Sequence, residues 1–179
     1  MTEPKPINEG HWVHQTAEYK MVAAYYGNRV AKRSSCRLME HIDEGLMLLE
    51  NWGVGIPLLR AWCLHPLMQD DRLYLEYIQY GSTMNEQATR IAVEYRAIAN
   101  AYLPKHQSRL PDISAMDEVN TLLLVDKLHN RWQFENTCMR RPGIYPNEQR
   151  LRQYFHEWLE ALSLNQSVAI AANKLWSQP

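Results

Sequence analysis

The sequence predicts an all-α domain of about six to eight helices. Apolar residues recur at helical spacing along most of the 179-residue chain, and caps and stop residues separate these stretches. β-branched residues are too few and too scattered to predict a sheet. Hydrophobic residues make up 46% of the chain, enough for a buried core without a disulfide or a metal. We therefore expect a single domain over residues 1–179.

Two helices are expected in the first third of the chain. Residues 15–26 place apolar side chains on one stripe, and Gly27 follows as a stop residue. Ser34 or Ser35 can cap the second helix, which should run to about Trp52.

The third helix is expected over residues 56–69. Pro57 suits its first turn, because a proline there has no hydrogen bond to lose. Pro66 lies within the same pattern and should kink or end the helix near His65. The fourth helix is expected to begin at one of two acids, Asp70 or Asp71.

The second half of the chain shows three more helix signals. Residues 83–86 form a capping box for a long helix that stops before Pro104. Ser114 begins a second cap signal, and the apolar helix after it should continue to about Phe134. The chain breaks at residues 140–143 before a last amphipathic helix.

Two flanking segments complete the organisation. Residues 1–13 should form a polar N-terminal arm. Residues 145–179 should form a C-terminal helical extension, whose last short helix is expected at 167–176.

Composition excludes several classes of function. Lysine and arginine total 19 against 20 acidic residues, so no basic field exists to hold nucleic acid or an anionic membrane. The longest apolar runs fall far short of the ~18 residues that a membrane helix needs. Three cysteines without a Cys-x-x-Cys pair are typical of a reducing compartment. We therefore expect a cytoplasmic protein without nucleic-acid or membrane partners.

Three residues stand out by their helix phase. His65 shares a face with Ala61 and Trp62, and Asp126 lies on the apolar stripe of the helix that carries it. A carboxylate on an apolar face is costly unless it is paired or bound to a metal. Together with His41, these side chains from three helices could form a divalent metal site. Helix phase alone is equally consistent with a buried contact between Asp126 and a histidine or arginine.

Three segments carry recognisable motifs, in this order: Arg33, Ser34 and His41, then Leu64, His65 and Asp70, then Leu124, Asp126, Leu128, His129 and Asn130. In their order and local sequence these segments resemble the HD-domain phosphohydrolases. The resemblance is strongest to the (p)ppGpp hydrolase domain of Rel/Spo-type alarmone enzymes and to small alarmone hydrolases, and it covers residues 27–134.

This resemblance implies an HD-like helical bundle, a metal and a nucleotide. His41, His65 and Asp126 would bind a divalent, Mn²⁺-like ion. Asp70, beside Gln69, would activate water. The implied nucleotide-binding residues are Arg33, Ser34 and Asn130, and the implied substrate is a guanosine polyphosphate.

Two departures from the family pattern bear on activity. Pro66 stands where the family has an aspartate ligand, and Gln69 stands where it has a glutamate that helps to activate water. Because glutamine cannot accept a proton from water, the chain should lose a general-base rate enhancement of roughly 10²–10⁴-fold. The resemblance thus implies a divergent, metal-dependent nucleotide phosphohydrolase, and the two departures predict weak activity. The alternatives are an inactive nucleotide-binding or regulatory protein and a protein–protein interaction scaffold.

Overall fold

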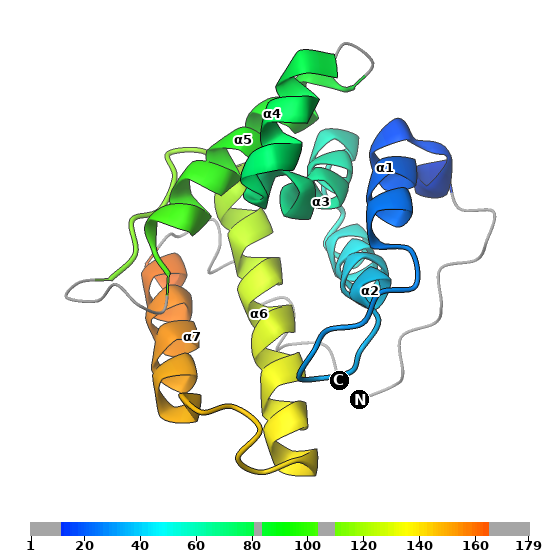
Figure 1. The fold of residues 1–179 in the computed structure, drawn as a ribbon. Coiled ribbons are helices and arrows are strands. Elements are labelled where there is room, and N and C mark those ends of the chain that lie inside the picture. Colours follow the sequence, from blue (N-terminus) through cyan, green and yellow to red (C-terminus); the bar gives the residue numbers. More distant parts are fainter. Residues whose placement is uncertain (1–11, 81–83, 104–109, 165–179) are drawn as a thin grey trace. The chain divides into compact units, whose positions relative to one another are not determined.

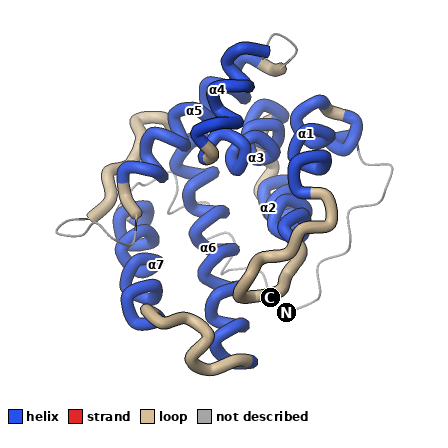
Figure 2. The backbone as a smooth tube through the Cα atoms, in the orientation of Figure 1, coloured by secondary structure: helices blue, strands red, loops and turns tan. Residues whose placement is uncertain are grey.

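The computed structural model describes residues 12–80, 84–103 and 110–164. Within these residues the chain is all-helical, as expected, with no strand (Figures 1 and 2). An isolated antiparallel bridge joins Val30 to Arg37. The helices are the 3-10 helix η1 (Trp12–Gln15), α1 (Ala17–Tyr26), α2 (Leu38–Asn51), α3 (Ile56–Gln69), α4 (Asp71–Tyr80), α5 (Glu86–Ala101), α6 (Asp117–Arg140) and α7 (Glu148–Ser163).

The chain forms two compact units. The first comprises Met1–Ala31 and Ser35–Arg96, and the second comprises Lys32–Ser34 and Ala97–Pro179. Helix α5 contributes its first part to one unit and its last residues to the other. The single domain expected from the sequence stays a prediction.

Helix α3 is the centre of the first unit. It packs against α1, α2 and α4, and every residue from 58 to 68 except Arg60 is buried. A helix that is apolar on all sides is one that neighbours cover on all sides, which explains why α3 lacks a polar face. Pro57 lies in its first turn, as predicted.

Pro66 does not end α3, which continues to Gln69. Proline has no N–H to donate to the carbonyl four residues earlier, here that of Trp62. That carbonyl instead accepts a hydrogen bond from Nδ1 of His65, at 2.6 Å. The Trp62 carbonyl oxygen, which loses its usual backbone donor to the proline, therefore has another donor. This hydrogen bond offsets part of the cost of a proline inside the helix.

Helix α2 begins later than predicted. Neither Ser34 nor Ser35 caps it, because Ser35 adopts a left-handed backbone conformation with φ of 62° and the helix starts at Leu38. Arg37 occupies the cap position, and its backbone N–H donates to the Glu40 carboxylate at 3.1 Å.

Helix α5 is capped by Asn85, whose side-chain oxygen accepts a hydrogen bond from the N–H of Ala88 at 2.9 Å. Thr83, the cap expected from sequence, lies outside the described residues. Other expected features that lie outside them are Pro104, most of the N-terminal arm and the short helix over 167–176.

The second unit is built on α6 and α7, which pack against each other. Helix α6 is longer than predicted, since it passes Phe134 and ends at Arg140. The buried face of α7 includes four of the five apolar residues that helical spacing places on it, Tyr154, Phe155, Trp158 and Leu162. The fifth, Leu151, is half-buried. Trp132 lies on α6 and is 53% exposed, although tryptophans at helical spacing are expected to lie mostly in the core.

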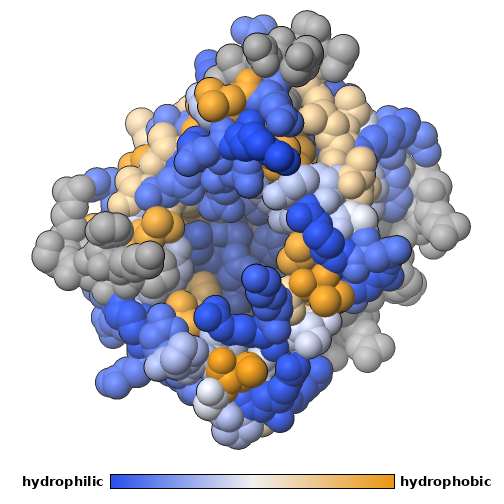
Figure 3. Space-filling model, viewed as in Figure 1, coloured by the Kyte–Doolittle hydropathy of each residue, from blue (hydrophilic) through white to orange (hydrophobic). Residues whose placement is uncertain are grey.

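Hydrophilic residues cover most of the face drawn in Figure 3, and hydrophobic residues lie there in separate patches. Across the described part of the chain, no helix combines the length and the apolarity needed to cross a bilayer.

Gly45 allows α2 to approach α3 closely. A Cβ atom added at Gly45 would lie 2.0 Å from Cζ2 of Trp62. Gly45→Ala should therefore lower the free energy of unfolding by about 1–3 kcal/mol through overpacking, although alanine favours helices more than glycine does. Urea unfolding of Gly45→Ala, with and without Trp62→Phe, measures this. The alanine should cost less beside the smaller ring, and an equal or stabilising effect in both backgrounds would contradict the close contact.

Candidate metal centre

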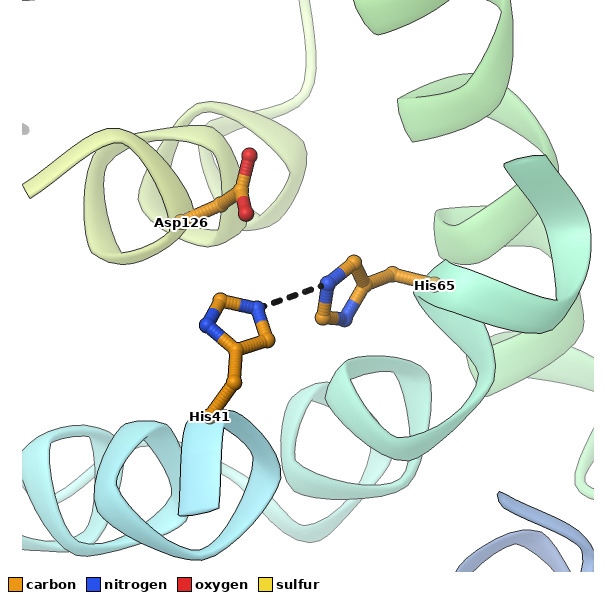
Figure 4. Close-up of side chains that lie close together, drawn as sticks. All are labelled: His41, His65 and Asp126. Carbon is orange, nitrogen blue, oxygen red and sulfur yellow. Dashed lines mark hydrogen bonds between the residues drawn. The ribbon is translucent and has the colours of Figure 1, made fainter. Parts of the chain in front are cut away.

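Two imidazoles from neighbouring helices of the first unit face each other (Figure 4). His41 lies on α2 and His65 on α3, and their Nε2 atoms are 3.3 Å apart. His65 is 2% exposed, whereas His41 is half-buried. The sequence predicted both as metal ligands, and the structure brings this pair together.

The hydrogen-bond partners assign the protons of the pair. A carbonyl oxygen can only accept, so the 2.6 Å contact with the Trp62 carbonyl requires a proton on Nδ1 of His65. In the neutral ring Nε2 of His65 is then the unprotonated nitrogen. In that tautomer the proton between the two rings lies on Nε2 of His41, and an ion bound by both Nε2 atoms would displace it.

The spacing of the pair suits two ligands of one ion. Metal–imidazole bonds of about 2.1 Å place two adjacent ligand nitrogens roughly 3.0–3.4 Å apart. The observed Nε2–Nε2 distance of 3.3 Å lies in that range. Histidines that bind metals almost always donate their other N–H to a carbonyl, a carboxylate or water, as His65 does here. This donor set fits a divalent metal.

Trp62 holds the two rings in place. Its ring centroid lies 4.9 Å from that of His41 and 4.3 Å from that of His65. Its indole N–H donates to the Ile42 carbonyl on α2 at 2.9 Å, which fixes the indole plane. Tyr95 meets His65 edge-on, with centroids 5.2 Å apart. The imidazoles are thus packed by aromatic rings.

Asp126 belongs to the second unit, on the buried part of α6. It is 3% exposed, as its place on the apolar stripe predicted. Its Oδ2 accepts a hydrogen bond from Nζ of Lys127 and its Oδ1 accepts one from Nδ2 of Asn130, both at 2.6 Å. The acid is therefore paired with a lysine and an asparagine, which helix phase alone did not suggest.

Lys127 is the buried partner of Asp126 that sequence reasoning missed. Residues adjacent in a helix normally point in different directions, so a pattern search does not pair 126 with 127. The long lysine side chain nevertheless extends toward Asp126, and its Nζ lies 5.2 Å from the ring centroid of Trp158. Burial acts to lower the pKa of Lys127, but the Asp126 carboxylate raises it, and the net pKa is above that of an ordinary lysine. Lys127 is consequently a cation at neutral pH.

The two predicted water-activating residues lie at the junction of α3 and α4. Asp70 and Gln69 are both exposed. Oδ1 of Asp70 accepts hydrogen bonds from the backbone N–H groups of Arg72 and Leu73, both at 3.0 Å, so this acid caps α4.

The predicted nucleotide-binding residues all belong to the second unit. Arg33 is exposed, with its guanidinium carbon 5.4 Å from the ring centroid of Tyr145, and Ser34 is half-buried. Asn130 is half-buried and bonds to Asp126, as described above.

Compared with protein-family models, with curated proteins and with solved structures, the chain matches none.

The Asp126–Lys127 pair should be worth far more than a surface ion pair. Lys127→Met leaves a buried carboxylate without its cation, so we expect the free energy of unfolding to fall by about 3–5 kcal/mol. In the double variant Lys127→Met/Asp126→Leu both charges are gone, and most of that loss should be recovered. Denaturant unfolding of chelator-treated protein measures both.

Arg152 provides the control, because it pairs with Glu148 and Glu135 while 44% exposed. Arg152→Met should cost less than about 1 kcal/mol. Equal losses for Arg152→Met and Lys127→Met would show that the buried pair has no special weight.

Proposed function

We propose that the chain is a divergent, metal-dependent nucleotide phosphohydrolase. The observation that carries this proposal is the pair of facing imidazoles, His41 and His65, at the spacing of two ligands on one ion. The hydrogen bond from His65 to a backbone carbonyl, which is typical of metal-binding histidines, supports it further.

Asp126 is the proposed third ligand. It belongs to the second unit, whereas His41 and His65 belong to the first, so its role as a ligand is a separate part of the proposal that the Asp126 variant below tests by itself.

A metal held by two histidines and one carboxylate keeps open coordination positions. A divalent, Mn²⁺-like ion there supplies Lewis acidity for a phosphoryl group and lowers the pKa of a bound water. The ammonium of Lys127 neutralises part of the charge on Asp126. Affinity for a hard ion should consequently be lower than with an unpaired carboxylate.

The proposed roles in water activation and nucleotide binding follow from the atoms of each side chain that lie away from the contacts described above. Both backbone contacts of Asp70 use Oδ1, so Oδ2 is the atom that would hydrogen-bond the attacking water. One face of the Arg33 guanidinium meets Tyr145, and a nucleobase would stack on the opposite face. Asn130 donates to Asp126 through Nδ2, and its amide oxygen would accept a hydrogen bond from the sugar. Ser34 would hydrogen-bond the same nucleotide, for which we propose a guanosine polyphosphate.

A second candidate function is nucleotide binding without cleavage. Pro66 has no side-chain atom that can bind a metal, and Gln69 cannot accept a proton from water. These two residues favour a sensor or a regulator that keeps the binding site and lacks the full catalytic set.

The metal site is tested by calorimetric titration of the full-length chain with Mn²⁺ and Zn²⁺. We expect one ion per chain, and at least roughly tenfold weaker binding in each of His41→Ala, His65→Ala and Asp126→Asn, because each variant loses one ligand. His156→Ala is the matched control, since His156 lies exposed on α7.

A wild-type protein that binds neither ion would overturn the metal site. If only Asp126→Asn binds like the wild type, the histidine pair stands and the proposed role of Asp126 as a ligand is wrong.

Catalysis is tested by restoring the two residues in which the chain departs from the family that it resembles. Pro66→Asp/Gln69→Glu adds a ligand and a proton acceptor, and the ligand gained at position 66 should outweigh the effect of the backbone N–H that replacing the proline restores. Mn²⁺-dependent pyrophosphate release from guanosine tetraphosphate should rise by at least roughly 10²-fold, the lower end expected for a positioned base. Adding His65→Ala to this double variant should abolish the gain.

The outcomes separate the alternatives. If both forms bind the nucleotide and neither cleaves it with any divalent metal, the binding protein is the better description. If calorimetry detects no nucleotide binding, only the scaffold function is left.

A further inference from the structure

Pro66 lies beside the proposed ligand His65 but presents no ligand atom of its own. It is buried within α3, and it follows directly on the histidine whose Nδ1 bonds to the Trp62 carbonyl. We propose that Pro66 is a positioning residue, which selects the metal-binding tautomer of His65 by leaving that carbonyl to the imidazole. The hydrogen bond from His65 to Trp62 does not depend on the proposed metal site. The benefit of selecting this tautomer does, because it is the one that can bind a metal.

The first step is the missing N–H. In a regular helix the N–H of residue 66 would donate to the carbonyl of residue 62. Proline removes this donor, so the helix itself leaves the Trp62 oxygen without its usual partner. Trp62 and His65 are both buried, so water is a poor substitute. The Nδ1–H of His65, at 2.6 Å, takes the position of the lost donor.

The second step is the tautomer. A neutral imidazole can carry its proton on either nitrogen, and only the unprotonated nitrogen binds a metal. The bond to Trp62 holds the proton on Nδ1, which leaves Nε2 of His65 as the atom that points toward Nε2 of His41. His65 is therefore prepared for a metal before one arrives.

The third step is the effect of a backbone donor at position 66. A carbonyl oxygen can accept two hydrogen bonds, so a restored N–H would compete with His65 without displacing it completely. The Nδ1–H form would lose part of its stabilisation. A larger share of His65 would then carry its proton on Nε2, where it blocks the metal.

The test is two-dimensional ¹H–¹⁵N NMR of ring nitrogens in the full-length, chelator-treated protein, with His65 assigned by its loss in His65→Gln. The wild type should show a protonated Nδ1 and an unprotonated Nε2. Pro66→Ala should show increased protonation of Nε2. Its dissociation constant for Zn²⁺ should rise by roughly tenfold, the lower end for loss of support around a ligand.

Pro57→Ala is the matched control. Pro57 is in the first turn of the same helix, where a restored N–H has no helical acceptor. This variant should keep the wild-type tautomer and the wild-type Zn²⁺ affinity. Pro66→Ser, which also restores the N–H, repeats the test if Pro66→Ala does not fold.

A wild type with its proton on Nε2 of His65, or a Pro66→Ala spectrum identical to that of the wild type, would overturn the inference. A tautomer shift in Pro66→Ala without Zn²⁺ binding by either protein would have another meaning. In that case Pro66 does position His65, and the proposed metal site is what fails.

Discussion

Helix α3, at the centre of the first unit, is buried on all sides and yet contains polar groups that need hydrogen bonds, namely the imidazole of His65 and the carbonyl of Trp62. A buried imidazole or carbonyl without a hydrogen bond costs free energy that few domains can spare. The side chain of His65 and the carbonyl of Trp62 meet this demand for each other, and His41 supplies the remaining contact. The facing imidazoles thus satisfy the hydrogen-bonding groups of a buried helix, and they are also the proposed metal ligands.

Trp62 connects the packing to this site. Its ring fills the space that Gly45 leaves on α2, and its indole N–H bonds to the carbonyl of Ile42. Its ring flanks both imidazoles, and its carbonyl sets the proton position on His65. Because one residue has all these contacts, the register of α2 against α3 and the geometry of the histidine pair cannot vary independently.

The second unit solves a similar problem with charge. Asp126 is buried on an apolar helix, and a buried carboxylate needs a counter-charge and hydrogen bonds. Lys127 and Asn130 supply them, and the rings of Tyr154 and Trp158 cover the lysine. A paired carboxylate gives less charge to a bound cation, so its folding role and its proposed metal-binding role oppose each other.

Local periodicity and turn residues were enough to predict the all-α class, the approximate helices and the inward phase of His65 and Asp126. The contacts of those buried groups depend instead on how the helices pack. Spacing could not show that Pro66 leaves a carbonyl for His65, since that bond requires a ring orientation fixed by Trp62. Spacing also could not pair Lys127 with Asp126, because the side chains of adjacent residues in a helix normally point in different directions. Here packing directs the long lysine side chain toward the carboxylate of Asp126.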